Sequence, residues 1–320
     1  LPDQPDAIPY VTSYYKRRWG FCLTHNQRMR LPKGKYRAFI DSEIKHGVLN
    51  YGELLIPSTN GSKKEVFLST YICHPSMANN ELSGPVVTVA LTEWLLSLSE
   101  RKHNYRIVFI PETIGSITYL SQTIDQLKRN VVAGYNITCV GDDRAYSYLP
   151  SRNGNTISDK VAQHVLKWTD PQYKKYSWED RGSDERQYCA PGIDLPIASI
   201  MRTKYGAYPE YHTSLDGLGN VVSPAGLEGG FETLKKALEA IEKNCLPQVQ
   251  VLGEPHLSKR NLRSTLSTKS IGKEIFTMMN LITWSDGNND LINIAEKCNV
   301  PVWELYPIVE TLIENDLISI

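Results

Sequence analysis

Histidine and carboxylate side chains follow apolar segments that have the pattern of buried strands. His74 and Glu112 come directly after two such segments, and Asp142 follows a third. Imidazole and carboxylate groups bind metal ions such as zinc, and they also act as general acids and bases. Polar residues are dense in four segments of this kind, 73–84, 111–116, 183–188 and 211–216. The pattern indicates a metal site or an acid–base site built from several loops.

The elements that must position these residues alternate between strand and helix. The apolar runs predict strands at 66–72, 107–110, 131–140 and 195–201, and helical patterns cover 84–98, 117–129, 159–168 and 223–244. This alternation is typical of an α/β domain with a mostly parallel central sheet flanked by helices. In such sheets, sites collect at the carboxyl ends of the strands. We expect this domain to cover residues 64–248.

The two ends of the chain depart from this pattern. Residues 9–70 are rich in Tyr, other aromatic and β-branched residues with turn signals between them, which predicts a β-rich region, and we expect residues 1–63 to form a small β-rich domain. Residues 246–267 contain Pro, Gly and many polar residues and are typical of a linker. Helical segments at 271–284, 290–298 and 301–315, with a short apolar run at 317–320, predict a winged-helix-like domain over residues 265–320.

Charge argues against nucleic acid as a partner. The chain has 35 basic and 35 acidic residues, so it has no net positive charge to attract phosphates. Between Asp286 and Ile320, seven acidic residues accompany one basic residue, Lys297. We therefore expect the last domain to contact a protein partner, a second copy of the chain or its own α/β domain, and not DNA.

Composition also bears on the compartment. The longest apolar runs fall short of the roughly 20 residues that span a bilayer. The six cysteines are scattered, without the dense framework of small disulfide-rich secreted domains, and no secretory leader is visible. We expect a cytoplasmic protein with no membrane segment.

The four polar segments resemble, in order and spacing, motifs of the zinc aminopeptidase family, which also includes glutaminyl cyclases and glutamate carboxypeptidases. Tyr211-His212-Thr213-Ser214-Leu215-Asp216 is similar to the family pattern Tyr-His-Thr-x-x-Asp, in which the His binds zinc. Segments at 73–76, 111–116 and 141–147 resemble a bacterial aminopeptidase-like group linked with polysaccharide biosynthesis. That group has an inserted β domain and a carboxyl-terminal winged helix. The resemblance implies that the first elements of the α/β unit lie upstream of Leu1.

Three positions depart from the family pattern. Asn80, Thr113 and Thr138 stand where the family has metal-binding carboxylates. A two-zinc site needs about five ligating side chains, so the resemblance implies one zinc ion more readily than two here. The ligands chosen first are His74, Glu81 and His212, and Asp142 and Asp184 remain further candidates.

The resemblance also implies a reaction. Three protein ligands leave one zinc position open for water, and Glu112 takes the place of the general base, which suits hydrolysis of an amide in a peptide or small-molecule substrate. Side chains that could orient a ligand or contact the substrate are Asp142, Asp184, Arg186 and Tyr188. Arg144, Arg152 and Arg186 could bind a substrate carboxylate or phosphate.

Simpler interpretations stay open for several of these residues. Glu81 and Glu112 could each stabilise the first turn of a helix, and Asp142 could belong to a turn. Cys73 is expected to be a small buried residue. Besides a metallo-aminopeptidase, the chain could be a binding or scaffolding protein that kept the fold and lost the reaction, or a ligand-sensing transcriptional regulator.

Overall fold

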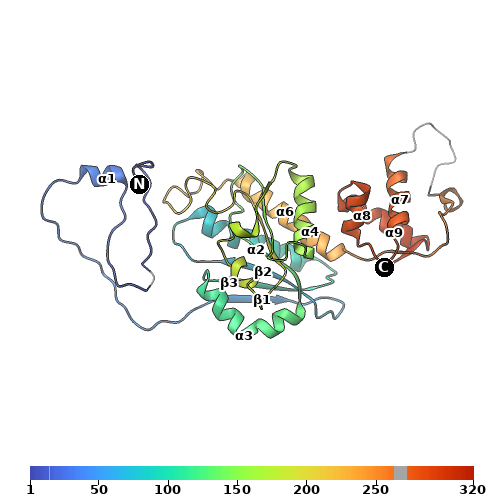
Figure 1. Cartoon of the computed structure of the whole chain (residues 1–320), viewed down its shortest axis with the longest axis horizontal. Coiled ribbons are helices and arrows are strands. Elements are labelled where there is room, and N and C mark those ends of the chain that lie inside the picture. Colours follow the sequence, from blue (N-terminus) through green and yellow to red (C-terminus); the bar gives the residue numbers. More distant parts are fainter. Residues whose placement is uncertain (14, 263–271) are drawn as a thin grey trace.

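The computed structural model describes residues 1–13, 15–262 and 272–320. Its centre is a seven-stranded sheet with the order β1-β3-β2-β4-β7-β5-β6 (Figure 1). The adjacent strands β3, β2, β4 and β7 run parallel, whereas β1 and β5 pair antiparallel with β3 and β7. The predicted mostly parallel α/β architecture is confirmed, as a mixed sheet. The strands are β1 (Gly52–Ile56), β2 (Glu65–Tyr71), β3 (Asn104–Ile110), β4 (Val131–Asn136), β5 (Ser147–Leu149), β6 (Lys174–Lys175) and β7 (Ile197–Met201).

Helices cover both faces of this sheet. On one face lie α2 (Ser83–Ser97), α4 (Ile157–Thr169) and α6 (Pro224–Lys243), and on the other α3 (Ile114–Asn130) and the short α5 (Glu185–Tyr188) (Figure 1). Alternation along β2 supplies both hydrophobic clusters: Val66 and Leu68 pack with the first set of helices and Phe67 with the second. All seven residues of β2 are buried, so the loop that follows this strand begins inside the domain.

The predicted β-rich domain over residues 1–63 is not found. The described residues before β1 contain one short helix, α1 (His25–Arg30), and no strand, while β1 itself belongs to the central sheet. Their large apolar side chains are exposed, among them Trp19 at 74% and Phe39 at 79%. Aromatic and β-branched residues favour a strand only where a neighbouring strand pairs with its backbone, and among the described residues before β1 such pairing is limited to an isolated bridge between Pro9 and Thr213.

The carboxyl-terminal region has the predicted winged-helix elements. They are α7 (Lys273–Trp284), α8 (Leu291–Cys298), η4 (Val302–Glu304) and α9 (Tyr306–Glu314), followed by β9 (Ile318–Ser319). The linker prediction for 246–267 is partly wrong. Within that stretch β8 (Gln248–Val249) pairs antiparallel with β9, and η3 (Leu257–Arg260) buries Leu257. The predicted domain start at residue 265 lies outside the described residues.

The winged helix packs against the α/β domain. One hydrophobic cluster contains Val161 and Val165 of α4 together with Ile292 of α8 and Val302 of η4. This shared apolar contact holds the two units together. Among the described residues, no helix combines the length and the apolar character needed to cross a membrane.

Candidate metal site

The site begins where two adjacent parallel strands end. Tyr71 at the end of β2 lies beside Ile110 at the end of β3, and the amide of Ile72 donates to the carbonyl of Ile110 at 3.0 Å. His74 and Glu112 follow these strand ends within three residues, so the sheet register brings them together. The Nε2 atom of His74 lies 3.9 Å from Oε2 of Glu112.

Glu81 comes from a π-helical turn, η1 (Ala78–Leu82), that precedes α2. A side chain on Gly84 would meet the carbonyl oxygen of Ile137 at 2.4 Å, so only glycine lets the first turn of α2, which follows this π-helical turn, lie so close to the residue after β4. Glu81 is 2% exposed, and its Oε2 accepts a hydrogen bond from the amide of Cys73 at 2.8 Å. Its Oε1 has no hydrogen-bond partner and lies 3.9 Å from Nε2 of His74.

Asp216 ties the His212 loop to this turn. Its carboxylate accepts hydrogen bonds from the amides of Asn79 at 2.7 Å and Asn80 at 3.0 Å, and its carbonyl accepts one from Ala78 at 2.8 Å. The tyrosine hydroxyl of Tyr208 donates to the same carboxylate at 2.9 Å. Asp216 is thus a positioning residue for Glu81. Its place in the Tyr-His-Thr-x-x-Asp segment was the signal that could have identified it.

His212 completes the group of predicted ligands. Its backbone has a φ of 57°, a left-handed conformation that histidine adopts more readily than most residues. Its ring stands edge-on to that of His74 with 4.8 Å between the centroids, and its Nε2 atom is buried without a hydrogen-bond partner. The structure therefore places His74 beside Glu81 and the predicted base Glu112, with the ring of His212 against that of His74.

Two residues that were not predicted for this site also reach it. Tyr10 lies against both histidines, with centroid distances of 4.4 Å to His74 and 5.4 Å to His212, and its amide donates to the carbonyl of His212. Cys73 is exposed, which corrects the expectation that it is buried. The potential ligand atoms of Cys73, His74 and Glu112 all lie within 4.8 Å of one another. Among the described residues this is the one group of three or more such side chains at that spacing, so the predicted ligands Glu81 and His212 lie outside it. Nothing local in the sequence could place Tyr10 here, whereas Cys73 adjoins His74.

The geometry fits a small divalent cation. In a tetrahedral zinc site, bonds of about 2.0–2.2 Å place ligand atoms roughly 3.3–3.5 Å apart. The separations of 3.9 Å between His74 and the two carboxylates are within about half an ångström of that spacing. The buried atoms without partners, Oε1 of Glu81 and Nε2 of His212, are also those that a cation would satisfy.

Protonation fits the same interpretation. Burial, followed by the neighbouring His212, lowers the pKa of His74 to about 4, so its ring is neutral at pH 7 and has a lone pair to donate. Burial raises the pKa of Glu81 to about 8 and that of Asp184 to about 7. Burial also raises the pKa of Glu112, opposed by a hydrogen bond from Ser183 and by Arg186. Buried carboxyl groups with raised pKa values release protons when a cation binds beside them.

The backbone next to Glu112 is strained. Thr113 has φ 61° and ψ −68°, and the amide of Ile114 donates to the carbonyl of Glu112 at 2.7 Å, which together make a γ-turn of the rare, strained form. Asp184 stabilises this turn by accepting hydrogen bonds from the Thr113 amide at 2.7 Å and the Ser116 hydroxyl at 2.8 Å. Strain of this kind concentrates at functional sites. It fixes the direction in which Glu112 leaves the sheet.

Arg186 lies beside the same turn, where one of its guanidinium nitrogens donates to the hydroxyl of Thr113 at 2.7 Å. Asp184 and Arg186 thus surround the Glu112 segment, in keeping with their predicted place near the site. The Oδ2 atom of Asp184 remains buried without a hydrogen-bond partner.

At the three positions that lack the family's carboxylates, uncharged side chains form hydrogen bonds. The hydroxyls of Tyr71 and Thr138 lie 2.6 Å apart, and the amide of Asn80 donates to the Tyr71 hydroxyl at 2.9 Å. The Thr138 hydroxyl also donates to the Asn80 carbonyl at 3.1 Å. Thr113 is bonded to Arg186 as described. No anionic side chain stands at these three positions to balance a second divalent cation.

Two other predicted site residues, Asp142 and Tyr188, form buried hydrogen bonds away from the site. The carboxylate of Asp142 is buried and accepts four hydrogen bonds, from Asn79, Arg144 and both the amide and hydroxyl of Thr203. It therefore has no capacity left for a metal or substrate. Tyr188 is fully buried in the core, where its hydroxyl bonds to Ser69 at 2.7 Å.

The two remaining arginines are also engaged elsewhere. Arg144 forms a two-pronged ion pair with Glu210 at 2.8 and 2.9 Å. Arg152 pairs with Asp194. Of the three arginines proposed for anion recognition, Arg186 is the one that lies beside Glu112.

Comparison with known proteins agrees with this architecture. Residues 7–244 match the family model described as a domain of unknown function (DUF4910), and residues 244–320 match a winged helix-turn-helix family. A protein of Clostridium acetobutylicum, provisionally named a polysaccharide biosynthesis protein with aminopeptidase-like domain, is 37% identical over 100% of this chain and 73% of its own length.

Solved structures add the fold. The crystal structure of a provisionally named peptidase from Clostridium acetobutylicum has a TM-score of 0.90 and 37% identity, covering 100% of this chain and 72% of that chain. A zinc aminopeptidase from Bacillus subtilis has a TM-score of 0.50 and 15% identity, covering 59% of this chain and 49% of that chain. The second likeness concerns the fold alone.

Proposed function

The chain belongs to the family of the domain DUF4910, with an aminopeptidase-like α/β domain and a winged helix, and we propose that it is a zinc-dependent aminopeptidase or amidohydrolase using one metal ion. The observation that carries this proposal is the position of His74. Its Nε2 atom lies 3.9 Å from both Glu81 and Glu112, next to the unbonded Nε2 of His212. A group of neutral imidazoles and buried carboxyls is a zinc-binding set.

Each side chain has a role in this proposal. His74, Glu81 and His212 would hold the zinc ion, with Cys73 near enough to contribute. The zinc ion would act as a Lewis acid and lower the pKa of a water molecule. Glu112 would accept the proton of the attacking water at its Oε2 atom and pass it to the leaving amine, a task for which its raised pKa suits it. Arg186 and Asp184 would keep the Glu112 turn in place.

Tyr10 would form one wall of the substrate pocket. The segment before it is fastened to the His212 loop by hydrogen bonds between Ile8 and Ser214 in both directions and by a bridge from Pro9 to Thr213. A ring held against two imidazoles excludes water from one side of the site. Exclusion of water strengthens the electrostatic interactions within a site.

The substrate class is inferred from the relative. Its name associates it with polysaccharide biosynthesis, so we propose an amide in an acylated amino sugar or in a peptide-linked saccharide as the bond that is cleaved. For the winged helix we propose packing and protein contact. The exposed side chains of α9 include Glu310 and Glu314 but no lysine or arginine, which is unfavourable for binding to DNA phosphates.

A combined test measures metal content and hydrolysis. Purified protein is analysed for zinc and assayed on aminoacyl anilides and acylated amino sugars. We expect about one zinc per chain. We also expect Glu112→Gln to keep the zinc and lose at least about 100-fold in kcat. Glu93→Gln, which changes an exposed carboxylate on α2, is the matched control. Absence of zinc together with absence of hydrolysis would refute the proposal.

A second candidate is a binding protein that kept the fold and lost the reaction. The neutral network of Asn80, Tyr71 and Thr138 favours it, because it replaces groups that would otherwise serve a metal. This candidate predicts that saccharide or peptide ligands bind with equal affinity to the wild type and to Glu112→Gln, with no turnover by either.

A further inference from the structure

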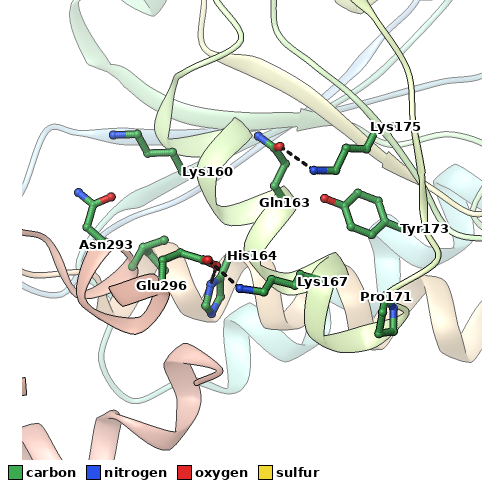
Figure 2. Close-up of a pocket in the computed structure, with 10 residues that line it drawn as sticks. Lys160, Gln163, His164, Lys167, Pro171, Tyr173, Lys175, Asn293 and Glu296 are labelled. Atoms are coloured by element: carbon green, nitrogen blue, oxygen red, sulfur yellow. Dashed lines mark hydrogen bonds and ion pairs between the residues drawn. The ribbon is translucent and has the colours of Figure 1, made fainter. Parts of the chain in front are cut away.

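A cleft at the junction of the two domains is separate from the candidate metal site. It has a volume of about 420 Å³, within the range of small-molecule pockets. Its walls come from α4, from the segment 171–175 that contains β6, and from α8 of the winged helix (Figure 2). None of the residues that line it belongs to the metal site.

The charge of this cleft is unbalanced. Its lining contains three lysines, Lys160, Lys167 and Lys175, and one acid, Glu296. The Glu296 carboxylate is already shared by Lys167 at 2.8 Å and by Nδ1 of His164 at 2.5 Å. Burial lowers the pKa of His164, so this ring adds no positive charge at neutral pH. Two positive charges therefore remain in a protein whose overall charge is zero.

The side chains of the cleft offer donors for an anion. Figure 2 shows Lys175 extending from β6 toward Gln163, with the ring of Tyr173 next to it, whereas Lys167 extends from α4 toward Glu296. The ammonium group of Lys175 has one hydrogen bond among the described residues, a long one of 3.4 Å to the Gln163 side chain. Such weakly engaged ammonium groups can be turned toward a ligand at little cost.

We propose that this cleft binds the phosphoryl group of a small molecule, with Lys175 as its direct partner and Lys160 and Lys167 contributing charge. A phosphate monoester carries close to two negative charges at pH 7, which matches the two uncompensated lysines. Lysine binds phosphate as a point charge. Tyr173 and Pro171 supply a ring and an apolar surface for the remainder of the ligand.

The winged helix forms part of this site. Ile292 and Asn293 of α8 line the cleft, and α8 is fixed to α4 by His164, whose Nε2 accepts a hydrogen bond from the Val302 amide at 2.9 Å while its Nδ1 donates to Glu296. The side chain of His164 is 1% exposed. A ligand in the cleft therefore contacts both domains in their docked arrangement and stabilises it by mass action.

Titration calorimetry of the full chain tests this proposal with glucose 1-phosphate, inorganic phosphate and glucose as probes. Both phosphate compounds should bind and glucose should not. Tighter binding of the ester would identify a phosphorylated metabolite as the ligand, and equal binding would identify free phosphate. Binding should weaken when the ionic strength is raised from about 0.05 M to about 0.5 M. Failure of both phosphate compounds to bind the wild type would overturn the proposal.

Neighbouring lysines provide a matched pair of variants. Lys175→Gln should weaken phosphate binding by about tenfold, the loss expected for one charge-assisted hydrogen bond. Lys174→Gln removes the same charge from the adjacent residue of β6, which does not line the cleft, and should change affinity by less than about twofold. Equal losses in the two variants would refute a specific site. Circular dichroism confirms that both variants fold.

Discussion

Glu81→Gln separates the metal-binding role of Glu81 from its effect on folding. In the structure this carboxyl group is 2% exposed, and burial raises its pKa to about 8 from an ordinary value of 4.5. Glutamine has nearly the same shape and keeps an oxygen that can accept the hydrogen bond from the Cys73 amide. It has no negative charge to give a cation. The substitution should therefore weaken zinc binding and relieve a cost to stability.

The sign of the stability effect follows from proton linkage. Between pH 4.5 and about 8 the folded metal-free protein holds a proton on Glu81 that the unfolded chain has released, so stability falls as pH rises through this window. At about 1.4 kcal/mol per pH unit, the whole window corresponds to roughly 3–5 kcal/mol. The metal-free variant should match the wild type at pH 5 and exceed it at pH 8 by roughly 2–4 kcal/mol.

Urea unfolding of chelator-treated protein at both pH values measures this difference. Asp184 titrates in the variant and the wild type alike, whereas Glu112, whose charge raises the pKa of Glu81, contributes to the difference through that interaction. Competition with a chromophoric chelator should show zinc affinity lower by at least about 100-fold. Glu93→Gln on the exposed face of α2 should change neither quantity. Unchanged zinc affinity, or a loss of stability at pH 8, would refute the reasoning.

Three further substitutions probe the supporting structure. Asp142→Asn should lower the free energy of unfolding by roughly 2–4 kcal/mol, because four donors lose a charged acceptor, and leave zinc content unchanged; urea unfolding and metal analysis measure both. Thr113→Gly should relieve roughly 1–3 kcal/mol of backbone strain, which exceeds the entropic cost of glycine, and so raise the free energy of unfolding. It should also lower kcat, because Glu112 is held less firmly. A lower free energy of unfolding would contradict this prediction. Asn80→Asp should destabilise the metal-free protein at pH 8, because it buries a charge among neutral hydrogen-bonding groups. Added zinc should restore part of the lost stability. A thermal midpoint that is unchanged by the substitution in the presence of chelator would contradict this prediction.

Several elements were predictable because their information is local. Runs of consecutive apolar residues predict β2, β3 and β7, and periodic apolar patterns predict α2, α3 and α6. Parallel strands separated by helices must end at one edge, so the proximity of His74 and Glu112 followed from the order of elements. The winged helix was predictable in the same way from three short helices and a final strand.

Other features depended on partners far along the chain. β1, β5 and β6 are short, and each is a strand only because a distant strand pairs with it. The described residues before β1 have strand-like composition, but their pairing is limited to an isolated bridge between Pro9 and Thr213, so they contain no strand. The hydrogen bonds of Asp142 could not be predicted from the sequence either, because three of its four donors belong to Asn79 and Thr203, which lie more than 60 positions away along the chain.

The candidate site combines both kinds of information. By itself the sequence determined which residues can bind a metal or move a proton, since His74, Glu81, Glu112 and His212 are distinguished by their chemistry and their place after strands. Only the tertiary structure decided that His74 lies beside Glu81 and Glu112, that Tyr10 packs against both histidines, and that Asp142 and Tyr188 form buried structural hydrogen bonds. The physical reason is that side-chain chemistry is a property of single residues, whereas burial, hydrogen-bond saturation and raised pKa values arise from groups that folding brings together.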